Sequence, residues 1–420
     1  MNRRMQSIGT SGYVCDWDTN KSLQKLQEAI IASMDLSKEM SDEEIKEIID
    51  GKILEAGKTH PLDLEDKKYL RREIFFAIRK LGILQELLLD PDITEIMVNG
   101  TDPVFVEKEG KLLQLSLRFD SKEKLGQVIQ QIAADGNKVV NESSPIADTR
   151  LQDGSRVNVV LAPVAINGPI LTIRRFPERT MTMEKLIGMG ALDDKVAVFL
   201  ETAVKAGYNI LVSGGTGCGK TTMLNALSGF IPSCERVISI EDSAELMLQG
   251  LPNLVRLETR NANVEGGKEI TIRDLLKTSL RMRPDRIIVG EVRGKEAIDM
   301  LQSMNVGHNA MTTVHANSTK DVVSRLETMV LMGMELPVGA IRRQIASGFD
   351  LMIHLGRVRD GSRKLLEIAE PYIDNSGEIE MNTLFRFRET GLEKERSVLG
   401  EWEKTGESIH VEKLMAAGLR

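Results

Sequence analysis

The chain has 420 residues, of which 41% are hydrophobic and 28% are charged, and its formal net charge is −7. This composition is that of an ordinary folded protein, and the length predicts two or three domains. The acidic balance and the aromatic content of 4% argue against a nucleic-acid-binding protein, which needs a basic face and stacking side chains. The three cysteines form no C-x-x-C pair, which argues against a disulfide framework and a four-cysteine zinc site.

The chain also lacks the usual membrane signals. Its start, MNRRMQSIGTSGYVCDWDTN, is too polar for a signal peptide. The longest apolar region, NVVLAPVAINGPILTI, is interrupted by Asn, Gly and Pro, so no membrane-spanning helix is expected. The cysteine usage is typical of a reducing compartment. We therefore expect a cytoplasmic protein that reaches a membrane only peripherally, through partners.

The first predicted elements are helices. Residues 1–20 are polar and aperiodic and are expected to be disordered. Residues 21–90 read as a small helical domain, with Ser41 and Glu44 at the spacing of a capping box. The apolar residues that recur there at helical spacing are Ile45, Ile48, Ile49, Ile53, Leu70, Ile74, Ile78 and Leu81.

Residues 91–177 are predicted to form an α+β domain. Asp90-Pro91 ends the last helix, and short alternating runs follow with turns at Asn99-Gly100 and Glu109-Gly110. One helix is expected at about 121–134, followed by the strands RVNVVLAPV and PILTIRRF.

Residues 178–372 alternate strands with helices, which predicts a parallel sheet flanked by helices. The strand candidates are NILVSG, RVISIED, LVRLET, RIIVGE and MTTVHA. The last segment, 373–420, is charged and only weakly patterned.

The motif GGTGCGKTT begins at the end of a predicted strand and matches the phosphate-loop pattern G-x-x-x-x-G-K-[ST]. Glycines let successive backbone N–H groups surround phosphate oxygens, and the helix that follows adds its dipole. Lys220 is expected to reach the β- and γ-phosphates, and the Thr221 hydroxyl to bind Mg²⁺. Cys218 fits a small filler, although a helix N-terminus beside a lysine also acidifies thiols. The expected nucleotide-binding residues are Gly214, Gly215, Thr216, Gly217, Cys218, Gly219, Lys220, Thr221 and Thr222.

Carboxylates end two other predicted strands. Glu291 ends RIIVGE, where an acid can hold Mg²⁺ through water or orient the attacking water. Glu241 follows RVISI and suits a general base, whereas Asp242 suits a helix N-cap.

Two histidines, His308 and His315, flank the strand NAMTTV. A metal pair is weakly indicated because no third ligand is near in sequence, and a structural role is another alternative. The more specific hypothesis is that His315 contacts the γ-phosphate.

Arginines are the remaining candidates. Phosphoryl transfer needs positive charge at the terminal phosphate, which another domain or subunit often supplies. The candidates are Arg150, Arg156 and Arg174, for which a surface ion pair is the alternative.

The segments GGTGCGKTT, SIEDSAEL, RMRPDRIIVGEVRG and MNVGHNAMTTVHANS stand in the order of the Walker A, Asp, Walker B and His boxes. The chain thus resembles the motor ATPases of type II and type IV secretion and of type IV pili. DPDITEIMVNG, RLQDGSRVNVV and LTIRRF resemble the N-terminal domain of the tight-adherence (Flp) pilus branch, the CpaF-like proteins. The resemblance extends from about residue 90 to 370.

This resemblance implies a RecA-like P-loop ATPase domain that uses ATP and Mg²⁺. It implies that Glu241 acts on the lytic water, that Glu291 serves the metal, and that His315, with His308 as a second candidate, senses the γ-phosphate. It also implies a homohexameric ring that acts on inner-membrane platform proteins and through them moves pilin or a secreted substrate, with no nucleic-acid partner.

Two features depart from the family pattern. VGHNA stands where T-G-H-[DE]-G is more frequent, so the role of the loop after His308 is open. The four-cysteine zinc element of the type II secretion and pilus-extension branch is absent, which argues against that branch.

Three other functions compete with the assembly motor. The boxes do not distinguish an assembly motor from one that retracts fibres or translocates DNA. A nucleotide-binding scaffold with little turnover is disfavoured by the presence of Lys220, Thr221, Glu241 and Glu291. A GTPase is disfavoured because no N-K-x-D base-reading motif occurs.

Overall fold

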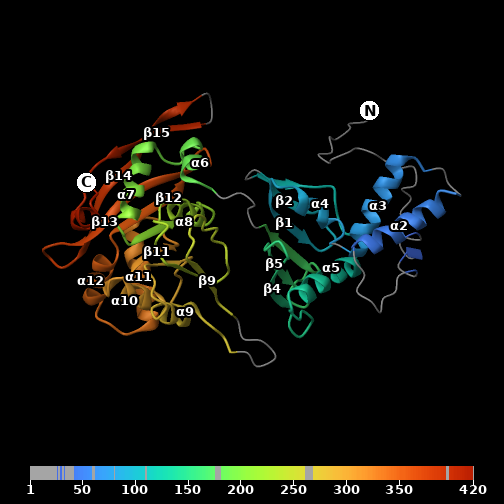
Figure 1. Ribbon diagram of the computed structural model, residues 1–420, viewed down its shortest axis with the longest axis horizontal. Coiled ribbons are helices and arrows are strands. Elements are labelled where there is room, and N and C mark those ends of the chain that lie inside the picture. The colour runs from blue at the N-terminus through green and yellow to red at the C-terminus, as the bar shows by residue number, and fades with distance from the viewer. Residues whose placement is uncertain are drawn as a thin grey trace. The chain divides into compact units, whose positions relative to one another are not determined.

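The computed structural model describes residues 26, 29–30, 33, 42–58, 62–79, 81–108, 111–175, 181–260, 268–393 and 397–419. The chain divides into two compact units, Met1–Glu178 and Arg179–Arg420. Each unit is drawn in Figure 1 and is described by itself. The expected disordered start at 1–20 lies outside the described residues, and the finer domain limits at 90 and 372 stay predictions.

The first unit begins with helices. α2 (Asp42–Ala56) packs on α3 (Leu64–Arg79), and their apolar residues share one small core that includes Ile49 and Ile74. The short helix α4 (Leu84–Leu89) follows and contributes Leu84 to a different core. The isoleucine spacing in the sequence therefore predicted the buried stripe of α2 correctly.

Among the described residues of the first unit, the sheet has six strands in the order β3-β2-β1-β6-β5-β4, each antiparallel to its neighbours. Helix α5 (Lys122–Asp135) buries Leu125, Ile129 and Ile132 in the core of this sheet, as the apolar spacing predicts. The strands are β1 (Ile93–Asn99), β2 (Phe105–Lys108), β3 (Lys111–Gln114), β4 (Ile146–Arg150), β5 (Arg156–Val160) and β6 (Ile170–Arg174).

The second unit has a nine-stranded sheet within its described residues, in the order β15-β14-β13-β12-β7-β11-β10-β8-β9. The strands from β12 to β9 in this order are parallel, and β13, β14 and β15 are antiparallel additions. The strands are β7 (Ile210–Gly214), β8 (Val237–Glu241), β9 (Leu254–Glu258), β10 (Arg286–Val289), β11 (Asn309–Val314), β12 (Leu351–Arg357), β13 (Arg363–Ile373), β14 (Ile379–Glu393) and β15 (Ser397–Lys404).

Helices cover both faces of this sheet (Figure 1). Within β7, Ile210 and Val212 join the core under α6, α7 and α8, whereas Leu211 joins the core under α9 to α12. Because the central strands are buried on both faces, they read as continuous apolar runs in the sequence. The helices are α6 (Met183–Gly188), α7 (Asp194–Lys205), α8 (Lys220–Ser228), α9 (Ile272–Ser279), α10 (Ala297–Asn305), α11 (Thr319–Gly333), α12 (Val338–Gly348) and α13 (Val411–Ala416).

The fold class is confirmed: a RecA-like α/β unit with a largely parallel sheet follows an α+β unit with an antiparallel sheet and N-terminal helices. The difference lies after residue 373, where the sequence was only weakly patterned and the structure has the long strands β14 and β15. Both strands contain many charged residues and few buried ones. They lie toward an edge of the sheet, where one face of the strand meets solvent. A charged edge strand carries little hydrophobic signal, so the sequence pattern did not reveal it.

Candidate active site

The phosphate loop joins the buried strand β7 to helix α8, which begins at Lys220. Gly214, Gly217 and Gly219 have φ angles of 154°, 69° and 93°, which L side chains rarely adopt. A Cβ atom on Gly214 would lie 2.6 Å from the carbonyl oxygen of Leu355 on β12. The glycines therefore serve both the curvature of the loop and its close packing against the sheet.

Strand order explains which side chains meet this loop. β11 lies between β7 and β10, and β8 follows β10. Parallel strands present their carboxyl ends at one edge of the sheet, where ligands bind in open α/β folds. His315 follows β11, Glu291 follows β10 and Glu241 ends β8. Residues far apart in the sequence are thus brought to one edge.

Lys220 is only 8% exposed, and its ammonium group contacts the loop itself. Its Nζ atom donates to the carbonyl oxygens of Gly214 and Gly215, each at 3.2 Å. The same atom lies 3.2 Å from Nε2 and 3.3 Å from Nδ1 of His315. Burial lowers the pKa of Lys220, and Glu291 acts in the opposite direction. The loop lysine is therefore held at the place where phosphate oxygens would bind.

His315 connects Lys220 to Glu291. Its Nε2 atom lies 3.0 Å from Oε1 of Glu291. Burial, and then the charge of Lys220, lower the pKa of His315 below its usual value of 6.5, so the ring is neutral at pH 7. A neutral imidazole has one N–H donor and one acceptor nitrogen.

Arg293 completes this line of charges. Its Nη2 and Nε atoms lie 2.6 Å and 2.8 Å from Oε2 of Glu291, and this bond raises the pKa of Arg293. The sequence contained Arg293 two residues after Glu291, but spacing alone did not show that its side chain returns to that carboxylate. The structure thus brings together Lys220, His315, Glu291 and Arg293.

Glu241 lies one strand farther from the loop and is 3% exposed. Its Oε2 atom accepts hydrogen bonds from the backbone N–H groups of Glu245, at 2.6 Å, and Leu246, at 2.8 Å. Burial raises the pKa of the Glu241 carboxyl group. Its side chain packs on Gly290, where a Cβ atom would lie 3.1 Å from the Cγ atom of Glu241. This carboxylate is therefore anchored beside the residue that precedes Glu291.

Two predictions for neighbouring residues are wrong. Asp242 caps no helix, because the described backbone from 243 to 253 contains none, and its carboxylate instead accepts from the Thr259 hydroxyl at 2.9 Å. His308 precedes β11 whereas His315 follows it, and six strand residues span about 20 Å at a rise of about 3.3 Å each. His308 Nδ1 lies 3.3 Å from the carbonyl oxygen of Ser303, so this histidine is not part of the site.

The site fits Mg²⁺ bound together with a nucleotide. Among the described residues, no three His, Cys, Asp or Glu side chains gather into a metal cage. Mg²⁺ keeps several waters and takes one or two protein ligands beside phosphate oxygens. The Thr221 hydroxyl would supply one ligand, and Glu291 would act through water. Oε1 of Glu291 is buried and has no aligned hydrogen-bond donor among the described residues.

Three predicted arginines belong to the first unit and form a row across its sheet. Arg150 on β4 pairs with Arg156 on β5, and Arg156 pairs with Arg174 on β6. The next residue in the row is Glu95 on β1, whose Oε1 atom lies 3.7 Å from Nε of Arg174. The three arginines are thus cross-strand neighbours in the sheet, although they are distant in the sequence.

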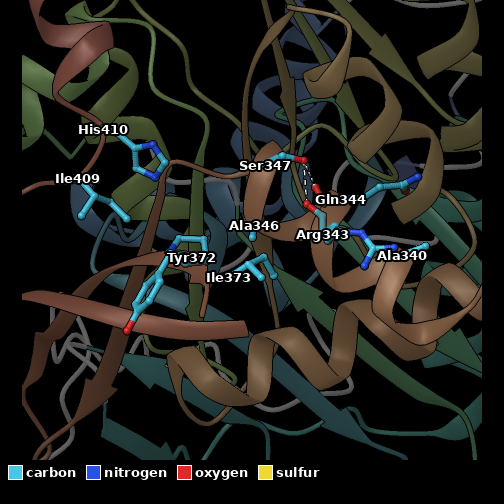
Figure 2. Close-up of a pocket in the computed structure, with 10 residues that line it drawn as sticks. Ala340, Arg343, Gln344, Ala346, Ser347, Tyr372, Ile373, Ile409 and His410 are labelled. Atoms are coloured by element: carbon cyan, nitrogen blue, oxygen red, sulfur yellow. Dashed lines mark hydrogen bonds between the residues drawn. The ribbon is translucent and has the colours of Figure 1, made fainter. Parts of the chain in front are cut away.

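A cavity of about 580 Å³ opens beside the loop and is lined by Gly215, Thr216, His315 and residues of α11. Cys218 is half-buried, and a Cβ atom on Gly214 would lie 3.3 Å from its Cβ atom. Figure 2 shows another cavity, of about 640 Å³, between α12, the end of β13 and Ile409–His410. None of the predicted site residues lines this second cavity.

The family model described as "Type II/IV secretion system protein" matches residues 78–387. The chain belongs to this family. This secretion-ATPase chain is 38% identical over 295 residues to a Mycobacterium tuberculosis protein named "Putative conjugal transfer protein", covering 69% of this chain and 83% of that protein. It is 32% identical over 321 residues to the type IV secretion system protein VirB11 of Brucella suis, covering 69% of this chain and 88% of VirB11.

The X-ray structure of the ATPase DotB of Yersinia pseudotuberculosis has the same fold, with a TM-score of 0.51 and 19% identity over 68% of this chain and 77% of that one. The protein is accordingly an ATPase of the type II/IV secretion family. The resemblance to this superfamily is confirmed, whereas the comparisons do not single out the CpaF-like branch. Within the described residues, no helix has the length and apolar character that a membrane span requires.

Proposed function

We propose that the protein is the ATP-hydrolysing motor of a tight-adherence (Flp) type pilus. In this proposal it acts as a homohexamer on the cytoplasmic face of the inner membrane and drives platform proteins that move pilin. The single observation that supports a motor best is the continuous line Lys220–His315–Glu291 at the carboxyl edge of the sheet. This line connects the phosphate loop to the carboxylate, so a γ-phosphate bound by the lysine is adjacent to both other groups.

Each side chain has a separate part in the proposed hydrolysis. Lys220 offsets the negative charge of the β- and γ-phosphates, and Mg²⁺, when bound, would offset more of that charge. Glu241, whose pKa is raised by burial, suits a general base that takes a proton from the attacking water. As water attacks the γ-phosphorus, the bond to the β-phosphate oxygen breaks and ADP leaves. His315 donates to the γ-phosphate, and Arg293 keeps Glu291 oriented.

The arginine row of the first unit supports a mechanical role. Arg150, Arg156 and Arg174 lie in one line on adjacent strands, as a surface that binds a polyanion would require. We propose that they contact the terminal phosphate in the assembled ring, so that binding and release of phosphate move one unit against another. A closed ring would repeat this motion at each subunit in turn.

The pilus assignment depends on the N-terminal motifs rather than on the site. RLQDGSRVNVV and LTIRRF, which resemble the CpaF-like branch, contain the three arginines of the row. A second candidate function is conjugal transfer, which is favoured by the similarity to the Mycobacterium tuberculosis conjugal transfer protein. The two candidates share the ATPase chemistry and differ in the cargo.

The first experiment measures ATP turnover against oligomeric mass for the purified full-length chain. The test variant is Glu291→Gln, and the matched control is Glu401→Gln, at an exposed position of β15. We expect turnover that appears with the hexamer, disappears in Glu291→Gln and persists in Glu401→Gln. Turnover by Glu291→Gln at the wild-type rate would remove this residue from the proposed site.

The second experiment separates the two cargoes. The gene is deleted in its own host and restored with either the wild-type chain or Glu291→Gln. Loss of surface pili that only the wild-type chain restores supports pilus assembly. Normal pili with defective transfer of a conjugative plasmid would reject pilus assembly in favour of conjugation.

A further inference from the structure

A row of polar side chains crosses the second sheet from the strand that carries the phosphate loop. Ser213 on β7 directly precedes Gly214 and is paired with His354 on β12. His354 is paired in turn with Glu367 on β13. Oγ of Ser213 lies 3.0 Å from Nδ1 of His354, and both side chains are buried. Side chains alternate along a strand, so Ser213 shares the face of Leu211, and the polar row lies under helices α9 to α12.

Glu367 connects this polar row to a helix. Its Oε2 atom accepts a hydrogen bond from the Thr319 hydroxyl at 2.6 Å. Thr319 is the first residue of α11 and is 2% exposed. Oε1 of Glu367 accepts from two residues of β14, the Thr383 hydroxyl at 3.1 Å and Nη2 of Arg386 at 2.8 Å. One carboxylate thus joins β13, β14 and the start of α11.

The start of α11 determines where His315 lies. β11 ends at Val314 and α11 begins at Thr319, so His315 lies on a connection of four residues, 315–318. The N-cap hydrogen bond of Ser318 lies within the helix itself, whereas the bond from Thr319 to Glu367 reaches the sheet. So short a connection follows any movement of the helix start. The imidazole ring that contacts the loop lysine would move with it.

We infer that Glu367 is a positioning residue of the ATPase site and acts through Thr319 on His315. Strand pairing fixes the place of Glu367, and through His354 it belongs to the same row as the strand of the phosphate loop. The carboxylate therefore holds the histidine at a set position relative to the loop. A misplacement of about 1 Å at a reacting group can cost about a hundredfold in rate. The inference rests on the proposed hydrolysis, in which His315 donates to the γ-phosphate, and it adds the group that keeps this histidine in place.

The surroundings of Glu367 suit an ionised carboxylate. Burial acts against its ionisation, but the hydrogen bonds from the two threonine hydroxyl groups and from Arg386 hold the pKa of Glu367 below its usual value of 4.5. Burial also lowers the pKa of His354, so that ring is neutral at pH 7 and Arg386 supplies the facing positive charge. An ionised carboxylate accepts at both oxygens, so the three hydrogen bonds can form together at pH 7.

The test compares two threonines that donate to the same carboxylate. Thr319→Val removes the hydroxyl group on α11, and the matched control Thr383→Val removes the one on β14. ATP turnover and ADP affinity by calorimetry are measured on the full-length chain with Mg²⁺. We expect Thr319→Val to lose about tenfold or more in kcat and to keep its ADP affinity within about twofold, because β7 retains both neighbouring strands. Thr383→Val should keep both values, and Thr319→Ser, which restores a hydroxyl group, should recover kcat.

A second measurement asks whether the effect passes through His315. In a His315→Ala background, Thr319→Val should cause no further loss of kcat, because the group that it positions is gone. Losses that multiply would overturn the inference. An equal loss of kcat in Thr383→Val would overturn it too, since the cause would then be a general disturbance of β13. A parallel loss of ADP affinity in Thr319→Val would show support of the loop instead.

Glu367→Leu removes the acceptor itself and should reproduce the kcat loss of Thr319→Val. Urea unfolding gives the folded fraction of each variant, and Thr319→Val, which keeps the branched shape of the side chain, provides the result if Glu367→Leu does not fold. The wild-type chain in the same assay tests the proposed function separately. Wild-type turnover with an unchanged kcat in Thr319→Val would reject the inference alone. A wild-type chain that binds ADP and hydrolyses no ATP in any assembly would reject the motor and the inference together.

Discussion

Replacement of Glu241 separates the energetic role of its oxygen atoms from the role of its charge. Glu241→Gln keeps a carbonyl oxygen that can accept from the N–H groups of Glu245 and Leu246, whereas Glu241→Ala removes the acceptor. Both variants remove the charge. A buried donor left without a partner costs about 1–3 kcal/mol, so two donors make Glu241→Ala less stable than Glu241→Gln by about 2–6 kcal/mol.

The comparison with wild type concerns the charge alone. Burial raises the folded-state pKa of Glu241 above its usual value of 4.5. A raised carboxyl pKa means that stability is fully present below the unfolded-state pKa and is lost as the pH rises through the folded-state value. At pH 7 the Glu241 carboxyl group therefore stabilises the fold less than an uncharged group of the same shape, and Glu241→Gln is expected to be at least as stable as wild type. This advantage should disappear near pH 4.

The assay is urea unfolding at pH 7 and near pH 4, together with ATP turnover at pH 7. We expect Glu241→Gln to combine a retained or raised unfolding free energy with slow hydrolysis. Equal stability of the Gln and Ala variants would refute the anchoring by Oε2. A Gln variant less stable than wild type at pH 7 would refute the cost of the buried charge. Wild-type turnover would make Glu241 a structural residue.

Three further predictions concern the loop and its surroundings. Lys220→Ala should abolish ADP binding in calorimetry. The thermal midpoint should be retained, because the substitution removes an ammonium group whose burial is unfavourable. ADP binding within twofold of wild type would contradict the role of Lys220. Gly214→Ala should lower the unfolding free energy by at least about 2 kcal/mol, because its Cβ meets the Leu355 carbonyl. The control is Gly250→Ala. Gly250 has a φ of 74°, and a Cβ atom there would meet no atom within 4 Å, so this variant should lose only the unfolding free energy that backbone strain costs. Asp360 has a pKa lowered to about 2 by its hydrogen bond to Ser362, so its contribution is present above pH 4 and lost as the pH falls toward 2. Asp360→Asn should therefore melt below wild type at pH 7 and together with it near pH 2; equal midpoints at pH 7 would exclude this contribution.

Local sequence patterns predicted the parts of the site that depend on local chemistry. The spacing from Gly214 to Thr221 indicated the loop, and apolar runs that end in Glu241 and Glu291 indicated strands with carboxylates at their tips. Strand geometry also excludes His308, since residues at opposite ends of a six-residue strand cannot meet the same phosphate.

Contacts between distant elements were not predictable in the same way. That Arg293 returns to Glu291, and that Arg357 reaches Gly217, depends on side-chain direction and on the position of β12 beside β7. The same holds for the arginine row, because the partners Arg150, Arg156 and Arg174 become neighbours only through strand register. The charged strands β14 and β15 lack an alternation strong enough to be read without their neighbours.

The position of β7 between β11 and β12 has a consequence for how the chain is made. On the ribosome, the strand that carries the phosphate loop emerges first, and its nearer partner begins only at Asn309. At about 5–20 residues per second, this strand, which is buried along its whole length in the folded unit, waits roughly 5–20 s without either neighbour. An unpaired apolar strand is prone to aggregate, so nascent chains in this window are the ones that most need chaperones. A product that ends before Val314 cannot complete the sheet around its own loop, and such a fragment should not bind nucleotide.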